Sequence, residues 1–353
     1  MNANKKNISS EKELLKVAID HILPEYDIKF KSIEQIKLKE TLKHRAVYKV
    51  SNDTESYCLK KVYFNEEKLL FMYSAMQWLH QNNFNVPVLM KTKQGNRFVS
   101  YNDLIFILTP WVPGIKCDFD NMEHLIIASK NLALAHNTSK NFFPIEGSYF
   151  KKGYDNLYIS INKRFNKLLT CYNLANKKKD KFSKIYLEHF DDNIKLARFA
   201  TEVASTINLD NLTKSLCHGD YVNKNLLFDD KKIYMIDFDK CSCDYSMADL
   251  TYFLRRLLKR SDTNWDFATA KNIITAYNEN NKLSEDDIKY IMVYLAFPQK
   301  YWRVSRDYFA SISKCNKKSS RESLLGTVSK TPNQIMMVEK FKVFFLDEFN
   351  IKF

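Results

Sequence analysis

The chain has 353 residues, of which 45% are hydrophobic, so it is long enough to bury a large core as one unit or two domains. Lys and Arg exceed Asp and Glu by 14, but they are spread along the chain, which argues against a nucleic-acid partner. No apolar run approaches 18 residues and the N-terminus is polar, so we expect no membrane span, no signal peptide and synthesis in the cytoplasm. The seven cysteines are scattered, which predicts reduced thiols.

The first third of the chain predicts a helix followed by an antiparallel sheet. Ser10 and Glu13 form a capping box at the start of the helix. Short alternating runs between residues 28 and 62 predict strands, and residues 65–82 predict a second helix. Two or three further strands are expected within residues 87–108.

The rest of the chain is mainly helical by its apolar periodicity. Helices are expected at 125–136, 159–176, 180–208, 247–260, 266–280, 284–295, 298–314 and 333–349. His136 ends the first of these helices, and we interpret it as a packed helix-end residue. No internal repeat or low-complexity tract is present.

One stretch joins a loop to a predicted β-hairpin. A His-Gly-Asp tripeptide ends at Asp220, Asn225 precedes two short apolar runs separated by polar residues, and Asp237 follows the second run. The hairpin would bring these three side chains to one end of a two-stranded ribbon. Phosphoryl transfer from a nucleotide needs such a group, because one carboxylate orients the attacking hydroxyl while other oxygen ligands hold Mg²⁺.

These residues resemble the catalytic signature of the aminoglycoside phosphotransferase and choline kinase group, which is related to the protein-kinase fold. Within that group the chain is most similar to bacterial spore-coat proteins of the CotS type. The stretches that carry this similarity are Leu108 to Gly114, Asp244 to Leu250 and Phe297 to Arg303. The resemblance implies an α+β, bilobal protein-kinase-like fold with a small antiparallel β-rich N-lobe and a larger, mainly helical C-lobe.

The resemblance also implies a division of the chain into three parts. Residues 1–9 would be a disordered tail. Residues 10–112 would form the β-rich nucleotide lobe, which ends in the hinge. Residues 113–353 would form the helical lobe with the catalytic loop and the substrate site.

The resemblance assigns roles to the residues that match the family motif. Asp220 would be the catalytic carboxylate that orients and deprotonates the acceptor. Asn225 and Asp237 would hold Mg²⁺. His218 and Asp249 would support the catalytic loop, Asp249 by accepting hydrogen bonds from its backbone.

Lys60 lies where kinases carry the strand lysine that contacts the α- and β-phosphates of ATP. Its expected partner is a glutamate of the following helix, and the sequence leaves Glu66 and Glu67 as alternatives. The hinge residues expected to bind the adenine of ATP are Thr109, Trp111 and Val112.

The chain departs from the family pattern in two places. Phosphate-clamping loops use glycine so that backbone N–H groups can approach phosphate, but residues 41–46 contain none. Lys43, His44 or Arg45 would contact phosphate instead. Asp239 stands where an Asp-Phe-Gly motif has glycine.

Lys300, Arg303 and Arg306 recur at three-residue spacing on a predicted helix. They would contact a carboxylate or phosphate of the acceptor, or else form a solvated basic stripe. The basic composition disfavours polycationic aminoglycosides as substrates.

Together with the resemblance, the sequence predicts an ATP- and Mg²⁺-dependent phosphotransferase that is associated with the endospore coat and acts on a hydroxyl of an unidentified small molecule. The alternative is a non-catalytic, kinase-like structural or assembly protein of the coat, with other coat proteins as partners.

Overall fold

The computed structural model describes residues 11–39, 45–311 and 316–353. The chain forms two compact units, each assembled from separated segments. The first unit comprises Met1–Cys117, Asn141–Lys151 and Asn223–Ser242, and the second comprises Asp118–Lys140, Lys152–Val222 and Cys243–Phe353. This division differs from the one placed at residue 112, because the hairpin expected with the helices belongs to the first unit. The predicted tail and Ser10 lie outside the described residues.

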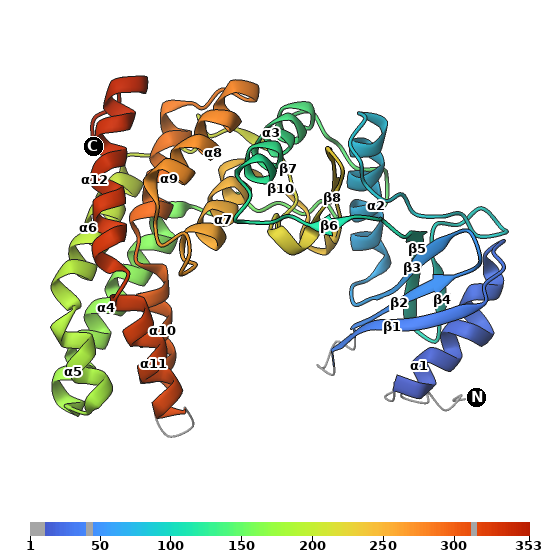
Figure 1. Ribbon diagram of the computed structural model, residues 1–353, viewed down its shortest axis with the longest axis horizontal. Helices are drawn as coiled ribbons and strands as arrows, with labels where there is room; N and C mark the ends of the chain where they lie inside the picture. Colours follow the sequence, from blue (N-terminus) through green and yellow to red (C-terminus); the bar gives the residue numbers. More distant parts are fainter. Residues whose placement is uncertain (1–10, 40–44, 312–315) are drawn as a thin grey trace. The chain divides into compact units, whose positions relative to one another are not determined.

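Five antiparallel strands form the main sheet of the first unit (Figure 1). In order across the sheet they are β1 (Ser32–Lys39), β2 (Arg45–Ser51), β3 (Ser56–Val62), β5 (Leu104–Pro110) and β4 (Val99–Tyr101). Because side chains alternate across a strand, Tyr48, Leu59 and Phe106 share the buried face. The antiparallel sheet predicted from the alternating runs is confirmed.

Helical segments flank the strands of this sheet. The N-terminal helix α1 (Glu11–Val17) continues as a π-helical turn (Ala18–Ile22) and a 3₁₀ turn (Leu23–Glu25), and its apolar residues join the core beneath the sheet. After β3, helix α2 (Glu66–Gln81) begins where the Asn65 side chain accepts a hydrogen bond from the Lys68 N–H.

The predicted hairpin is confirmed and is part of a second, three-stranded sheet in the first unit. Its order is β6 (Ile115–Lys116), β8 (Leu226–Asp229) and β9 (Lys232–Met235). Gly114 precedes β6 with φ +106°, and a Cβ there would lie 2.3 Å from the Phe228 carbonyl oxygen, so only glycine fits this approach. Short 3₁₀ turns at Asn223–Asn225 and Phe238–Lys240 flank the hairpin.

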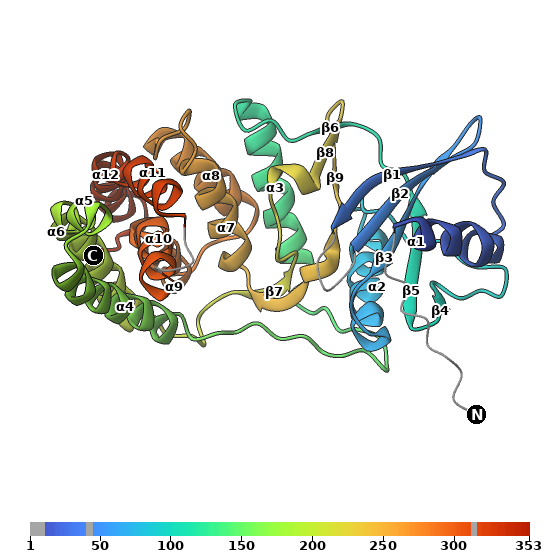
Figure 2. The same ribbon diagram turned by 90° about the horizontal axis from the view of Figure 1, so that it is seen from below.

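The second unit is mainly helical, with one two-stranded sheet of β7 (Lys214–Cys217) and β10 (Ser242–Tyr245). Its helices are α3 (Met122–Thr138), α4 (Leu157–Lys178), α5 (Lys181–Glu188), α6 (Phe190–Ser205), α7 (Met247–Leu258), α8 (Phe267–Asn280), α9 (Glu285–Ala296), α10 (Gln299–Ala310), α11 (Lys317–Val328) and α12 (Thr331–Phe349). Helix α10 packs between α4 and α11, as the turned view in Figure 2 shows. The α+β class predicted from the sequence is confirmed.

Two helices differ from prediction. The helix expected over 180–208 is broken at His189 into α5 and α6. Helix α11 was not predicted, because its sequence is rich in Ser and Lys and buries only Leu324 and Val328. None of the helices in the described ranges is both long and apolar enough to traverse a bilayer. The six cysteines in these ranges form no disulfide with one another.

Candidate active site

Lys60 on β3 forms two ion pairs within the first unit. Its Nζ lies 2.6 Å from Oδ1 of Asp237 and 2.6 Å from Oδ1 of Asp239, which follow the hairpin. The three side chains are largely buried, with Asp239 only 3% exposed. Burial alone would lower the pKa of Lys60, but the charges of Asp239 and Asp237 outweigh it and raise that pKa. The group carries one positive and two negative charges, which leaves it net negative by one.

The backbone around Asp237 explains how two carboxylates reach one lysine. Asp237 adopts a left-handed conformation (φ 68°, ψ 61°), which Asp tolerates better than most residues. The 3₁₀ turn that follows places Asp239 on the same lysine. The Ile236 N–H donates to the Asn225 carbonyl oxygen at 3.0 Å, so Asn225 lies beside the residue that precedes Asp237. Asn225 is itself buried.

The donor atoms of this group fit a divalent cation such as Mg²⁺. Oδ2 of Asp239 is buried and makes no hydrogen bond within the described residues. Burying a carboxylate oxygen without a partner is costly, so the position favours a cation. Asp237 and Asp239 supply carboxylate oxygens and Asn225 an amide oxygen, which are the ligand types that Mg²⁺ prefers.

The expected glutamate partner of Lys60 must be corrected. Glu66 and Glu67 are exposed in the first turn of α2, and neither pairs with Lys60 in the part of the chain that the structure describes. Asp239 takes that place. Sequence reasoning missed this role, although the aspartate at the usual glycine position was the signal. Residues 40–44, which include Lys43 and His44 of the predicted phosphate loop, lie outside the described residues.

The three residues predicted to form a hinge differ in what they can offer a ligand. Thr109 is buried in β5 opposite Cys58 of β3. The Trp111 N–H donates to the Ser56 carbonyl oxygen at 2.9 Å, so it is committed to the sheet. The Val112 N–H makes no backbone hydrogen bond with the described chain. Trp111 and Val112 also line a cavity of about 540 Å³ within the first unit.

The Asp220 loop belongs to the second unit and is held by Asp249 of α7. Oδ2 of Asp249 accepts the His218 N–H at 2.5 Å, and Oδ1 accepts the Gly219 N–H at 2.9 Å. Nδ1 of His218 accepts the Asp220 N–H at 3.2 Å, which closes the loop on itself. The next residue, Tyr221, anchors the loop to α3. Its hydroxyl donates to the Ala128 carbonyl oxygen at 2.7 Å.

A buried network behind this loop includes His136, which was expected only to pack. Its Nδ1 lies 2.7 Å from the Tyr277 hydroxyl and its Nε2 lies 3.5 Å from Oδ2 of Asp249. Burial would raise the pKa of Asp249, but the hydrogen bonds and charge of His136, with those of His218, lower it overall. His136, Cys217 and Asp249 have ligand atoms within 4.8 Å of one another, but the hydrogen bonds of Asp249 and His136 identify a loop support.

The structure separates the three basic residues proposed to contact the acceptor. Lys300 and Arg303 line a pocket of about 460 Å³ in the second unit. Arg306 does not line that pocket. Its Nε and a terminal nitrogen donate to Oδ1 of Asp307 at 2.8 and 2.6 Å, and its guanidinium lies 4.5 Å from the centre of the Trp302 ring.

Residues 41–282 match the profile of the "Phosphotransferase enzyme family". The chain is 19% identical over 284 residues to spore coat protein S of Bacillus subtilis (strain 168), covering 78% of this chain and 81% of that protein. It also resembles an aminoglycoside phosphotransferase from Alicyclobacillus acidocaldarius subsp. acidocaldarius DSM 446 (TM-score 0.79, 16% identity, 91% of this chain and 94% of the other). A further similar structure is amicoumacin kinase hAmiN in complex with AMP-PNP, Ca²⁺ and Ami (TM-score 0.61, 14% identity, 95% and 94%).

These similarities confirm the protein-kinase-like fold and the relationship to spore-coat proteins of the CotS type. The family profile spans more than half of the chain. The chain therefore belongs to the phosphotransferase enzyme family.

Proposed function

We propose that this chain is an ATP- and Mg²⁺-dependent phosphotransferase whose acceptor is a hydroxyl of a small molecule. The observation that supports this most strongly is the pairing of Lys60 with Asp237 and Asp239, 177 and 179 residues further along the chain. One cation and two carboxylates meet the needs of a triphosphate and its metal ion, because the lysine can bind phosphate while the carboxylates bind the metal.

The first unit would bind the nucleotide. Asn225, Asp237 and Asp239 would hold Mg²⁺, which would neutralise the negative charge of the nucleotide phosphates. Lys60 would bind the α- and β-phosphate oxygens. The Val112 N–H would bind the adenine edge, with Thr109 and Trp111 contributing to the surrounding wall.

Asp220 would orient the acceptor hydroxyl and accept its proton. As the acceptor oxygen bonds to the γ-phosphorus, the bond from that phosphorus to the β–γ bridging oxygen breaks, and ADP leaves with the electron pair. Asp249 keeps the loop in one position by accepting the N–H groups of His218 and Gly219. Holding the reacting groups in place in this way supplies much of the rate enhancement.

The experiment is phosphorylation of a metabolite extract with ATP labelled at the γ-phosphate. Wild-type protein should give a labelled product, and Asp220→Asn should reduce the rate by roughly 100-fold or more, the usual contribution of a positioned proton acceptor. The control is Asp229→Asn, which changes an exposed carboxylate at the end of β8. This variant should label the acceptor as wild type does. Equal labelling by wild type and Asp220→Asn would contradict the role of Asp220.

A second candidate is a non-catalytic protein of the spore coat, and the similarity to spore coat protein S supports it. Under either candidate we propose that the chain resides in the spore coat and contacts other coat proteins. A purely structural protein would neither label an acceptor nor bind Mg-ATP at millimolar concentration. Detection of the chain in coat extracts of purified spores tests the location separately from the activity.

A further inference from the structure

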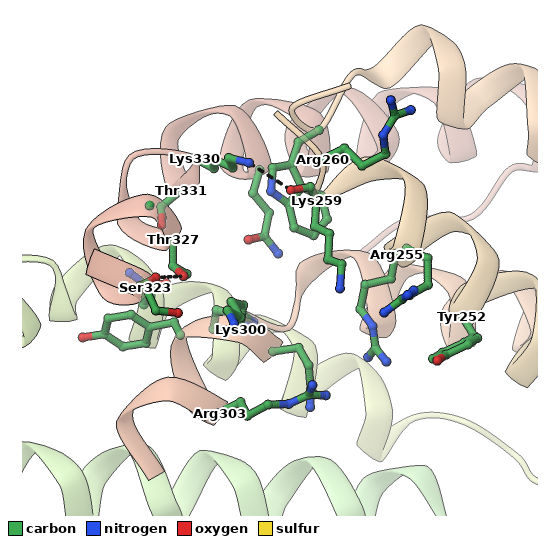
Figure 3. Close-up of a pocket in the computed structure, with 18 residues that line it drawn as sticks. Tyr252, Arg255, Lys259, Arg260, Lys300, Arg303, Ser323, Thr327, Lys330 and Thr331 are labelled. Carbon is green, nitrogen blue, oxygen red and sulfur yellow. Dashed lines mark hydrogen bonds between the residues drawn. The ribbon is translucent and has the colours of Figure 1, made fainter. Parts of the chain in front are cut away.

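A pocket in the second unit has a strongly basic lining. It has a volume of about 460 Å³, within the range of small-molecule sites. Six of its Lys and Arg residues, here called the basic pocket residues, are Arg255, Arg256, Lys259, Lys300, Arg303 and Lys330. No Asp or Glu lines the pocket among the residues that the structure describes. Figure 3 shows the side chains of Arg255, Lys259, Lys300 and Arg303 directed toward one space.

The charges of the basic pocket residues are not balanced by carboxylates. None of the six has a carboxylate oxygen within 4.0 Å in the described ranges. Neighbouring Arg260 shows the contrast, since it turns away and pairs with Asp120 at 2.6 Å. Lys330 donates to the Lys259 carbonyl oxygen at 3.0 Å, which ties the start of α12 to the end of α7.

Burial and the crowding of like charges lower the pKa of one of the three lysines in this pocket, Lys259. Burial, followed by the charges of Arg256, Arg255, Arg303 and Lys300, lowers the pKa of Lys259 to about 8. Burial also lowers the pKa of Arg255. Such crowding is unfavourable in the protein alone, and an anion placed among the side chains would relieve it.

Two helices begin at this pocket without a capping side chain. Helix α10 starts at Gln299 after Pro298, and α12 starts at Thr331 after Lys330. All four residues line the pocket. A helix N-terminus carries a partial positive charge, so cations such as Lys300 and Lys330 are unfavourable there and an anion is favourable. Lys300 and Lys330 therefore destabilise the starts of these two helices, and the same two residues add positive charge to the pocket.

Helix α7 connects this pocket to the Asp220 loop. Asp249, which accepts the loop N–H groups, lies six residues before Arg255, or roughly 9 Å along the helix axis. One rigid element therefore carries both the support of the candidate catalytic loop and a wall of the basic pocket.

We propose that the basic pocket binds the anionic end of the phosphoryl acceptor, a small molecule that carries at least two phosphate or carboxylate groups. The acceptor assignment rests on the proposed function, whereas binding of the anion does not. Arginine side chains match both groups, because their N–H donors pair with two oxygens at once. The pocket is too small for a nucleic-acid duplex, so a low-molecular-weight ligand fits best.

Isothermal titration tests the site with three probes: fructose 1,6-bisphosphate for phosphates, citrate for carboxylates and fructose as the neutral control. Wild type should bind at least one anionic probe and not fructose. The double variant Lys300→Gln/Arg303→Gln should weaken that binding by at least about tenfold, because two charge-assisted contacts are removed. The matched control Lys177→Gln/Lys178→Gln removes the same charge from exposed positions of α4 and should change it less than about twofold.

Binding of only one anionic probe identifies its group as the one recognised, and binding of both supports the shared chemistry. No binding of either probe, or an equal loss in both double variants, overturns the site. The acceptor assignment predicts that Lys300→Gln/Arg303→Gln also lowers labelling of the metabolite extract at least tenfold, and unchanged labelling overturns it. Mg-ATP binding distinguishes failure of one proposal from failure of the other, since Asp237→Asn should weaken it at least about tenfold whereas Lys300→Gln/Arg303→Gln should leave it unchanged.

Discussion

Asp239 and Lys60 form an ion pair of 2.6 Å at a position where an Asp-Phe-Gly motif has no side chain to offer. The second carboxylate changes how the strand lysine is held. The lysine needs no glutamate from α2, and Glu66 and Glu67 remain in solvent. The position of α2 is therefore not tied to Lys60 by an ion pair, whereas the position of the turn after the hairpin is.

Replacing Asp239 with Asn tests this pairing. The variant should lose about 1–3 kcal/mol of unfolding free energy, because the buried lysine loses the negative charge of one of its two partners. Urea unfolding at pH 7 measures the loss, and Asp229→Asn should stay within about 0.5 kcal/mol of wild type. If Asp239→Asn has the same unfolding free energy as wild type, the pair has no structural role.

The pH dependence of the same variant has a defined sign. Asp239 and Asp237 raise the pKa of Lys60 above its ordinary value of 10.5. A raised lysine pKa stabilises the fold fully below the unfolded-state value, and the contribution disappears only above it. The difference in unfolding free energy between wild type and Asp239→Asn should therefore be constant from about pH 6.5 to 9.5. A difference that shrinks across this range would show that another group is responsible.

Asp249→Asn should disorder the Asp220 loop. The asparagine side chain has one acceptor oxygen, so it can accept only one of the two backbone N–H groups. Its NH₂ group would face the other. We expect a loss of about 2–4 kcal/mol by urea unfolding and a fall in kcat larger than any change in KM for ATP. Proportional changes in both kinetic constants would contradict a positioning role.

The acid dependence of this variant follows from the lowered pKa of Asp249. Its ordinary value is 3.8, and a depressed carboxyl pKa stabilises the fold above that value and is lost as pH falls through the lower folded-state value. The difference in unfolding free energy between wild type and Asp249→Asn should therefore be constant above about pH 5. It should narrow only below about pH 3.8. If this difference already narrows at pH 6, a group other than Asp249 is responsible.

Binding of an anion at the basic pocket should weaken as Lys259 loses its proton. The pKa of Lys259 is about 8, set by burial and by Arg256, Arg255, Arg303 and Lys300. An anion favours the charged lysine, so fructose 1,6-bisphosphate should bind more tightly at pH 7 than at pH 9 and should take up protons on binding near pH 8. Lys259→Gln should flatten this profile. An identical pH profile in Lys259→Gln would exclude Lys259 as the titrating group.

Gly114 and Gly95 form a matched pair for testing backbone approach. Both have positive φ (106° and 87°), but a Cβ at Gly114 would meet the Phe228 carbonyl oxygen at 2.3 Å, whereas a Cβ at Gly95 has no atom within 4 Å. Gly95→Ala should cost about 1–2 kcal/mol of unfolding free energy from conformation alone. Gly114→Ala should cost clearly more, because β6 must move away from β8. Equal losses would show that the contact is not limiting.

Much of the fold could be predicted because the signals are local. Alternating runs gave the antiparallel sheet, and apolar periodicity gave most helices, since each depends on residues a few positions apart. Helix α11 was not predicted, because only two of its residues are buried and they form no apolar periodicity. The break between α5 and α6 at His189 was not predicted, because apolar residues continue on both sides of it.

The candidate site could be predicted only where a motif carries it. The hairpin, which its turn pattern predicted, brings the Asn225 carbonyl oxygen to the N–H of Ile236, the residue before Asp237. The partner of Lys60 lies 179 residues away, and no local pattern specifies such a pair. Three-residue spacing grouped Lys300, Arg303 and Arg306, but it cannot tell which of them faces a pocket built from α7, α10, α11 and α12.

The most direct measurement is ATP binding by isothermal titration, with and without Mg²⁺, for wild type and Asp237→Asn. Asn tolerates the left-handed backbone at this position, so the variant removes the charge with little strain. Wild type should bind ATP at least about tenfold more tightly with Mg²⁺ than without it, and Asp237→Asn should lose that difference. Equal affinity of wild type for ATP in the two conditions, or no binding at millimolar ATP, would contradict a nucleotide-metal site at Lys60, Asp237 and Asp239.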